Sequence, residues 1–300
     1  MKKFSVFLLS AFTLLTLNAQ DFNAEFTKAL RDGDTVKQQE ILSLWDKSED
    51  RSPDYYIANF NYNFNQAQDN TVIMTNEKPQ YGEYITISDT ISGTVGYLTS
   101  GGVREDLLRK AIKYIDEGIG KYPSRLDMRC GKIYSLYRSW RWDDFTKEII
   151  KAIDYSYIIG NKWIYPDENA DKDFFLSIVQ EYQTYLFDEV DLDEYKTEDS
   201  LQVMRIREIS QTVLKYYTDN VEALNNVGAT YFFNSEPSKA LEFFLKAEKI
   251  DPKDAIIKFN IANIYAKQGD KSKAKQYYED IIKNCDNEAA FQAEELMKQL

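Results

Sequence analysis

The sequence predicts an all-α protein, an array of antiparallel helix hairpins that carries one small β-hairpin insertion. Glycine and proline are scarce, at 12 and 6 of 300 residues, which favours long helices over a loop-rich sandwich. The C-terminal part repeats itself with a period of 34 residues, because the pattern of residues 221–254 recurs in residues 255–288. Upstream, apolar residues recur at the three- and four-residue spacings that place them on one face of a helix.

The first residues read as an export signal. Lys2 and Lys3 supply a positive start, and residues 4–17 form a mostly apolar run without charge. This run is shorter than the roughly 20 residues that span a bilayer, so we interpret residues 1–19 as a signal peptide cleaved after Ala19. An uncleaved N-terminal anchor is the alternative. No cysteine stands directly after the cleavage site, so no lipoprotein acceptor is expected there. We expect a periplasmic or secreted protein.

Charge and composition narrow the classes of function. The formal net charge is -12 and becomes -14 once the two lysines of the signal are removed, so phosphate backbones and anionic lipid are repelled. We therefore expect no nucleic-acid partner, and no membrane span after signal cleavage. Histidine is absent, which removes Ser-His and Cys-His nucleophile pairs and imidazole metal sites. We expect no metal and no cofactor, and we interpret Cys130 and Cys285 as free core residues.

The N-terminal part predicts one hairpin and a second, interrupted helix pair. Residues 23–31 and 35–45 form the first hairpin. Residues 53–66 and 105–122 form the second pair of helices. Aromatic residues surround the helix at 53–66 on every side, which predicts a helix buried all round. These aromatic residues are Tyr55, Tyr56, Phe60, Tyr62 and Phe64.

Residues 69–102 break the helical pattern. Segments 72–74, 83–88 and 94–98 are rich in strand-favouring residues, and 89–93 suits a turn. Apolar and hydroxyl residues alternate in the middle segment, which predicts one buried face. The segment is therefore interpreted as a small β-hairpin inserted in a repeat. Both a binding role and simple packing on the helices remain open.

Two further hairpins and two interruptions follow. Residues 126–139 pair with 142–155, and 173–188 pair with 200–217; segments 161–172 and 189–199 interrupt them. The second interruption is strongly acidic and raises a calcium loop as one interpretation. It lacks the glycine that the helix-loop-helix calcium motif needs for its sharp turn, so a solvated linker is favoured.

The repeated segments place small and bulky residues in the same register. Small residues occupy positions where two helices approach closely, and aromatic residues fill the space beside them. The matched pairs are Asn226 with Asn260, Gly228 with Ala262, Tyr231 with Tyr265, Ala240 with Ala274, and Phe244 with Tyr278.

This pattern resembles the tetratricopeptide repeat (TPR). The first copy carries the pattern at Leu224, Val227, Gly228, Tyr231, Ala240, Phe244 and Pro252. The second copy departs from it at Lys258, in place of a large residue, and at Asp286, in place of the closing proline. The resemblance implies a TPR-like superhelical array of antiparallel hairpins. We divide the chain into a signal peptide at 1–19, divergent TPR-like repeats at 20–220 with the β insertion at 69–102, two TPR repeats at 221–288 and a capping helix at 289–300.

The resemblance also implies a concave face, lined by the first helix of each hairpin, that binds a protein or peptide. In the last two repeats the lining residues would be Glu222, Asn225, Ala229, Phe232, Phe233, Phe259, Asn263 and Lys267. The three phenylalanines would offer apolar contact to a partner, or would pack against neighbouring helices; both interpretations stay open.

We therefore expect a non-catalytic protein–protein interaction or scaffold module of the bacterial cell envelope, as part of a possible envelope complex. A glycan- or nutrient-binding envelope protein is the alternative. An enzyme that uses paired carboxylates, for example among Asp143, Asp144 and Glu148, is disfavoured because such residues at helical spacing are usually solvated.

Overall fold

The computed structural model describes residues 21–79, 84–90, 93–191, 197–284 and 287–300. These residues form helices α1 to α13 and strands β1 to β5, which confirms the predicted helical array with a small β insertion. They divide into two compact units: the first holds residues up to 71 and 101–118, and the second holds 72–100 and 119–300. The predicted signal peptide at 1–19 lies outside the described residues.

The first unit contains the predicted N-terminal helices. They are α1 (Phe22–Arg31), α2 (Thr35–Lys47), α3 (Pro53–Ala67) and most of α4 (Glu105–Lys121). Carboxylates of Asp21 and Asp34 cap the N-termini of α1 and α2 by accepting from backbone N–H groups. Four of the five aromatic rings of α3 are buried and Tyr62 is half-buried, so these rings form core. The helix is not buried on every side as predicted, because Asn65 is exposed.

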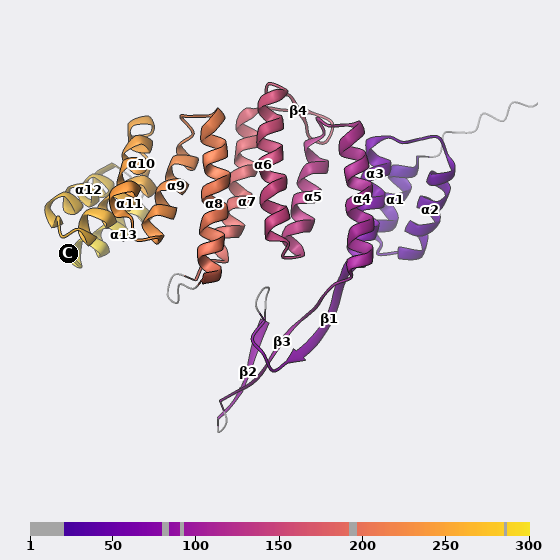
Figure 1. Ribbon diagram of the computed structural model, residues 1–300, viewed down its shortest axis with the longest axis horizontal. Coiled ribbons are helices and arrows are strands. Elements are labelled where there is room, and N and C mark those ends of the chain that lie inside the picture. The colour runs from indigo at the N-terminus through magenta and orange to yellow at the C-terminus, as the bar shows by residue number, and fades with distance from the viewer. Residues whose placement is uncertain (1–20, 80–83, 91–92, 192–196, 285–286) are drawn as a thin grey trace, which may run out of the picture. The chain divides into compact units, whose positions relative to one another are not determined.

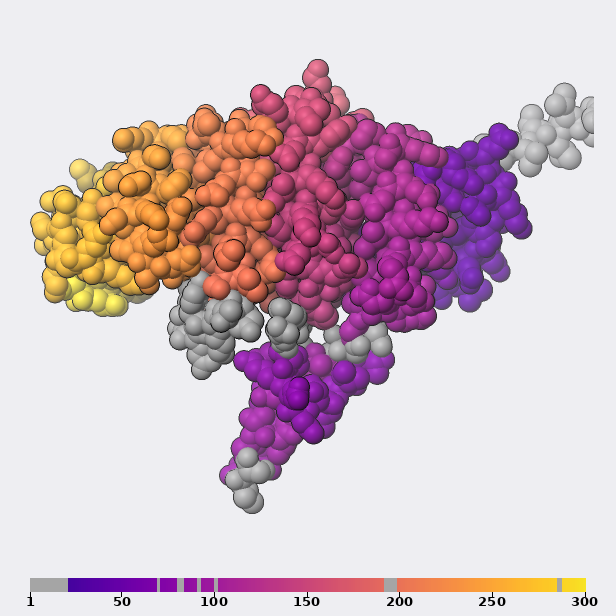
Figure 2. All heavy atoms as spheres, in the orientation of Figure 1, coloured from indigo at the N-terminus to yellow at the C-terminus, as the bar shows by residue number. Residues whose placement is uncertain are grey.

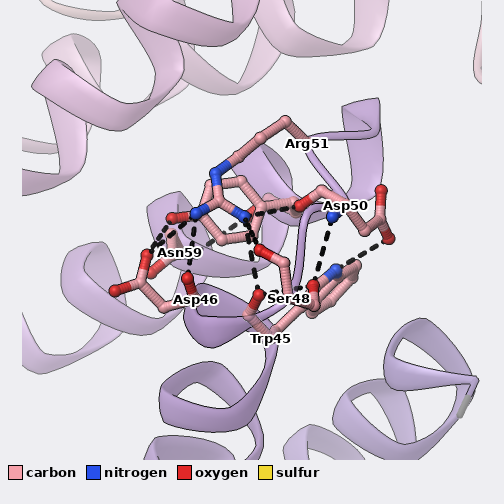
Figure 3. A network of polar contacts seen from close by, with 7 residues as sticks. Trp45, Asp46, Ser48, Asp50, Arg51 and Asn59 are labelled. Carbon is pink, nitrogen blue, oxygen red and sulfur yellow. Dashed lines mark hydrogen bonds and ion pairs between the residues drawn. The ribbon is translucent and has the colours of Figure 1, made fainter.

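An arginine closes the end of α2. The Arg51 guanidinium donates to the backbone carbonyls of Trp45, Asp46 and Ser48 at 3.5, 2.9 and 3.1 Å (Figure 3). These bonds lie at the C-terminal end of the helix, where backbone carbonyls have no partner further along the helix. Its carbon Cζ lies 4.3 Å from the centre of the Tyr55 ring, and the Tyr55 hydroxyl donates to Asp46 Oδ1 at 2.7 Å. One cation therefore joins the end of α2 to the start of α3.

Asp50 completes this network. Trp45 Nε1 and the Ser52 backbone N–H both donate to its carboxylate at 2.8 Å. Partial burial alone would raise the pKa of Asp50, but these hydrogen bonds and the nearby Arg51 outweigh it, so the pKa lies below its ordinary value.

A lowered pKa makes the stability of this region depend on pH. The folded protein binds the Asp50 proton less tightly than the unfolded chain, so the ionised carboxylate stabilises the fold above pH 3.8 and this contribution is lost as the pH falls through the folded pKa. In Asp50→Asn the hydrogen-bond acceptor remains but the charge does not. Urea unfolding of both proteins between about pH 6 and pH 3 should show the wild-type advantage shrinking toward the acid end. If the wild type instead gains free energy of unfolding relative to Asp50→Asn as the pH falls, the lowered pKa of Asp50 is contradicted.

The insertion forms a three-stranded sheet. Its strands are β1 (Gln68–Thr75), β2 (Tyr84–Asp89) and β3 (Gly93–Val103), in the order β1-β3-β2 (Figure 1). Strands β2 and β3 form the predicted antiparallel hairpin, and the register shifts between Ile87 and Ser88. At the base of the insertion the Arg104 N–H donates to the Ala67 carbonyl at 2.8 Å, so the chain leaves α3 and enters α4 at one point.

The predicted buried face of the middle strand is wrong. No residue of β2 is buried; Ile85 is 68% exposed, and Val72 on β1 is 67% exposed. Alternation of apolar and hydroxyl residues indicates that a face suits burial, but it does not supply a layer to cover that face.

The second unit stacks four hairpins and a terminal helix. The pairs are α5 (Leu126–Arg138) with α6 (Trp142–Ile158), α7 (Lys172–Asp188) with α8 (Thr197–Tyr216), α9 (Val221–Phe233) with α10 (Pro237–Ile250), and α11 (Ala255–Lys267) with α12 (Lys271–Asn284). Helix α13 (Asn287–Lys298) packs on α12. Neighbouring helices follow one another in chain order and form a continuous packed surface (Figures 1 and 2).

The interruption at 161–172 contains a small strand pair that was not predicted. Strands β4 (Trp163–Ile164) and β5 (Asn169–Ala170) form a short antiparallel ladder. Strands of two residues carry no periodic signal, so the pattern gave no sign of them. The buried Trp163 ring stacks on Phe175 at 5.4 Å, and its Nε1 donates to Ser156 Oγ at 2.9 Å.

The predicted small-to-bulky interlock holds α9 against α10. A Cβ atom added at Gly228 would lie 2.6 Å from Phe244 Cε1, closer than real atoms approach. Ala262 and Tyr278 occupy one buried cluster at the matching place in the next repeat. Lys258, which replaces the usual large residue, is 5% exposed and forms an ion pair with Asp280.

Removing the Phe244 ring should therefore destabilise the array strongly. We expect Phe244→Ala to lower the free energy of unfolding by about 3–5 kcal/mol, because the side chain is buried and its loss leaves a cavity. Lys253→Ala, at an exposed position between repeats, should cost less than about 0.5 kcal/mol. Chemical denaturation distinguishes them, and equal midpoints for the two variants contradict this packing.

The turns of three hairpins in the second unit, α5–α6, α9–α10 and α11–α12, share one backbone conformation. Trp140, Ser235 and Gly269 have positive φ angles of 51°, 58° and 81°, each directly after the C-cap residue of a first helix. The next residue in each turn donates its N–H to a carbonyl five residues earlier, as Glu236 does to Tyr231 at 2.9 Å. Gly33 between α1 and α2 has the same conformation, with φ of 69°.

This conformation favours glycine. Introducing a glycine in one turn should therefore stabilise the protein, and replacing the glycine of another turn should destabilise it. Ser235→Gly should raise the free energy of unfolding by roughly 0.5–1 kcal/mol, because relief of strain exceeds the added entropy of the unfolded chain. Gly269→Ala should lower it by about 1 kcal/mol, although no atom lies within 4 Å of the new Cβ. Urea denaturation measures both, and a destabilised Ser235→Gly would rule out the strained turn.

Candidate functional site

The residues predicted to bind a partner lie along one side of α9 and α11. Glu222, Asn225, Ala229 and Phe232 are separated by three or four residues, so they form one stripe of α9, and none of them is buried. We call the exposed and half-buried sides of the first helices α5, α7, α9 and α11 the first-helix surface. The predicted residues divide into three groups along it.

Glu222 lies at the N-terminal end, apart from the aromatic residues. It lines a polar recess of about 250 Å³ at the starts of α7, α9 and α11. The recess is lined by Lys172, Asp173, Leu176, Tyr217, Asp219, Asn220, Val221, Glu222, Asp251 and Asp254. Within the described residues, no group of acidic or cysteine side chains is arranged to hold a metal ion.

The amides in the middle of the surface bind one another and the neighbouring helices. Asn260 Nδ2 donates to Asn225 Oδ1 at 2.8 Å, which joins α11 to α9. The Tyr278 hydroxyl donates to Asn263 Oδ1 at 2.8 Å. Each of these acceptors already has an internal partner, so they stiffen the surface as well as lining it.

The C-terminal end of the surface is aromatic. The Phe232 and Phe233 rings lie 6.4 Å apart and are both half-buried. Lys267 Nζ lies 4.3 Å from the centre of the Phe232 ring, which brings two predicted residues from different repeats together. Phe259, in contrast, packs against the buried cluster around Tyr278.

Aromatic residues that were not predicted continue this group across α7 and α5. Phe187 contacts Phe233 edge-on at 6.4 Å, and Tyr185 stacks on Tyr137 at 4.4 Å with the rings inclined by only 21°. Tyr134 lies beside Tyr137 and is 44% exposed. The aromatic row, as we name it, consists of Tyr134, Tyr137, Tyr185, Phe187, Phe232 and Phe233.

A signal for these residues exists in the sequence but is weak. Tyr137, Phe187 and Phe233 each lie within the last two residues of a first helix, at the point where the chain turns back. If the sequences of α5, α7 and α9 are aligned at their C-terminal ends, these three residues fall within one position of one another. The divergent repeats share no motif that would fix this alignment from the sequence.

Carboxylates surround the α5–α7 part of the row. Glu181 accepts from the Tyr185 hydroxyl at 3.2 Å; burial, followed by this carboxylate, raises the pKa of Tyr185 to about 12. Burial and then Glu189 raise the pKa of Tyr137, which Arg138 partly offsets. Burial, reinforced by the neighbouring Asp188, raises the pKa of Glu189 itself.

The carboxylates considered for catalysis lie elsewhere and take part in ion pairs. Asp143 pairs with Arg205 at 2.7 Å, Asp144 with Arg141 at 2.8 Å, and Glu148 with Lys132 and Lys151 at 3.1 and 2.6 Å. The thiol of Cys130 is free, and burial raises its pKa to about 12. Cys285 lies outside the described residues.

Comparison with protein families identifies the class of the last two repeats. Residues 221–254 and 255–287 each match the family model described as the tetratricopeptide repeat, at the positions where the small-to-bulky pattern predicted it. Two other helical hairpins, α5–α6 and α7–α8, precede them in the second unit. No helix of the described residues is both long and apolar enough to cross a bilayer. A comparison with curated protein sequences finds no match.

Solved structures similar to the chain include TPR proteins. One is the C-terminal part of a TPR-containing protein from Cytophaga hutchinsonii, with 13% identity, a TM-score of 0.45, and coverage of 88% of this chain and 79% of that one. A thermophilic TPR protein from Thermus thermophilus has 10% identity, a TM-score of 0.39 and coverage of 62% and 89%. YrrB, described as a TPR protein with an unusual peptide-binding site, has 16% identity, a TM-score of 0.39 and coverage of 63% and 84%.

Proposed function

We propose that the chain is a non-catalytic interaction or scaffold module of the bacterial cell envelope, which binds a protein or peptide on the concave side formed by its first helices. Tetratricopeptide repeats generally mediate protein–protein interactions, which supports the class of function. The observation that carries the proposal is the aromatic row. It runs across three successive hairpins, and its members are half-buried or, for Tyr134, exposed.

Half-buried aromatic rings on a rigid surface suit a partner. Each ring is held by packing against its neighbours, so binding would fix few side chains that were free before. Tyrosine and other aromatic residues dominate the residues that carry binding energy in interfaces. A partner segment laid across α5, α7 and α9 would cover the exposed edges of these rings.

The location in the cell envelope rests on residues 1–19. A positive start and an apolar run too short for a comfortable span support export and cleavage after Ala19. The mature chain would then begin at Gln20.

Photocrosslinking in intact cells tests the proposal. A photoreactive benzoylphenylalanine at Phe233 of the full chain should give a discrete crosslinked product with a partner protein, while the same residue at Tyr157 should not. Tyr157 is a matched control because it is 58% exposed and lies on α6, a second helix. The recovered protein should begin at Gln20. Equal products from the two positions, or products from Tyr157 alone, contradict the proposed binding surface.

Affinity for the captured partner provides the second measurement. Phe233→Ala should weaken binding roughly tenfold, as truncation of an interface aromatic commonly does, while its melting temperature is recorded as a control for folding. Tyr157→Ala should leave the affinity unchanged.

A further inference from the structure

Three side-chain amides of the first-helix surface share one arrangement. Gln180 on α7, Asn225 on α9 and Asn263 on α11 are half-buried, and we call them the amide row. The oxygen of each amide accepts a hydrogen bond at 2.8 Å from a neighbouring helix. These bonds fix the direction in which each amide points. The donors are Asn226 Nδ2 to Gln180, Asn260 Nδ2 to Asn225 and the Tyr278 hydroxyl to Asn263.

The amide nitrogens of the row are available to a partner. None of the three has an acceptor among the described residues, and none is among the buried polar atoms that lack a hydrogen bond, so each is in contact with solvent. An amide whose oxygen is already occupied binds mainly through its two N–H donors. The row therefore presents oriented donors to a molecule that covers it.

The amide row runs beside the aromatic row. Phe187 follows Gln180 by seven residues, and Phe232 follows Asn225 by seven. Seven residues are close to two helical turns, so each ring lies on the same side of its helix as the amide, about 10 Å further along. On α7 and α9 the surface thus offers hydrogen-bond donors on one side and half-buried aromatic rings on the other.

We propose that these two rows bind a proline-rich segment of the partner in the polyproline II conformation. The carbonyl oxygens of that segment accept from the amide row, and its pyrrolidine rings pack on the aromatic row. The inference rests on the proposed function and specifies the chemistry of its partner.

The hydrogen-bonding groups favour this occupant over a helix or a strand. An α-helical partner uses its carbonyl oxygens within the helix, so only those of its last turn could accept from the amides. An ordinary strand would bring N–H groups for which the row, with its oxygens occupied, has no matched acceptor. A polyproline II chain has no internal hydrogen bonds, and proline has no N–H to satisfy.

The repeat distances also agree. One turn of polyproline II contains three residues and rises roughly 9 Å, while packed helices lie about 8–10 Å apart. Successive turns of the segment would therefore meet successive first helices. Grooves lined by aromatic residues bind proline-rich segments in this way, because the segment is ordered before it binds.

Peptides of equal length and no net charge test this occupant. Three fluorescein-labelled peptides of about 20 residues are compared by fluorescence anisotropy with the full mature chain: an oligoproline, a flexible glycine–serine peptide and an alanine-rich helical peptide. Oligoproline should bind at least roughly tenfold more tightly than the glycine–serine peptide, because it is ordered beforehand and its rings pack on the aromatic row. The helical peptide should bind most weakly, because its carbonyl oxygens are already used.

A matched pair of variants tests the amide row. Asn225→Asp keeps the oxygen that accepts from Asn260 and removes both donors, so it should weaken oligoproline about threefold to tenfold. Gln211→Glu makes the same kind of change at an exposed position of the second helix α8, and it should leave the affinity unchanged. Because oligoproline is uncharged, the added charge has little effect by itself.

A second pair tests the aromatic row. Phe187→Leu should weaken oligoproline by a similar factor, whereas Phe291→Leu, at a ring that is 65% exposed on α13, should not. Melting temperatures are recorded for every variant. If Phe187→Leu is unstable, Gln180→Glu provides another test, because it keeps the acceptor for Asn226 and removes two donors.

The outcomes separate this inference from the proposed function. Equal affinities for oligoproline and the glycine–serine peptide, no measurable binding of oligoproline at about 1 mM, or equal effects of Asn225→Asp and Gln211→Glu would each overturn it. Tighter binding of the helical peptide would also overturn it and would indicate a helical partner. If the crosslink at Phe233 persists in these cases, the first-helix surface still binds a partner of different chemistry. If that crosslink is lost as well, the proposed function fails too.

Discussion

The close approach of two helices at Gly228 is the contact on which the second unit depends. Without a side chain at that position the Phe244 ring enters the space between α9 and α10, and Ala262 with Tyr278 repeats the arrangement in the next hairpin. Each hairpin alone leaves one face of its helices uncovered, and stacking on the neighbouring hairpin buries it. The spacing between the two helices of each of these hairpins follows from this interlock.

Left-handed turns fix how the helices of three hairpins, α5–α6, α9–α10 and α11–α12, reverse direction. Trp140, Ser235 and Gly269 adopt the same backbone conformation although only one of them is glycine. A non-glycine residue in this region is strained, and it persists where the packed helices on either side determine the turn. Tyr137 and Phe233 each lie two or three residues before such a turn, so the turn geometry also sets where the ends of the aromatic row project.

Secondary structure and burial could be predicted from the sequence where apolar residues recur with a helical period. The roles of residues that depend on contacts between hairpins could not be predicted in this way. The repeats at 221–254 and 255–287 and the helices around them followed from spacing alone, because a packed helix must repeat its apolar face. The buried face of β2 was wrong because burial depends on a second layer that no local pattern encodes. In the candidate surface, Phe232 and Lys267 were predicted from the repeat register. Tyr137 and Tyr185 were missed, because they meet across hairpins whose motifs have diverged.

Charge placement differs along the chain. Many ion pairs of the described residues, such as Lys37 with Glu40, join residues one helical turn apart and contribute little to stability. Asp188 and Glu189, at the C-terminal end of α7, form no ion pair with a lysine or arginine of the described residues. Burial, reinforced by Asp188, raises the pKa of Glu189, because a partly buried carboxylate loses solvation of its charged form. An acidic segment brought to this place would therefore meet like charge in addition to the cost of desolvation.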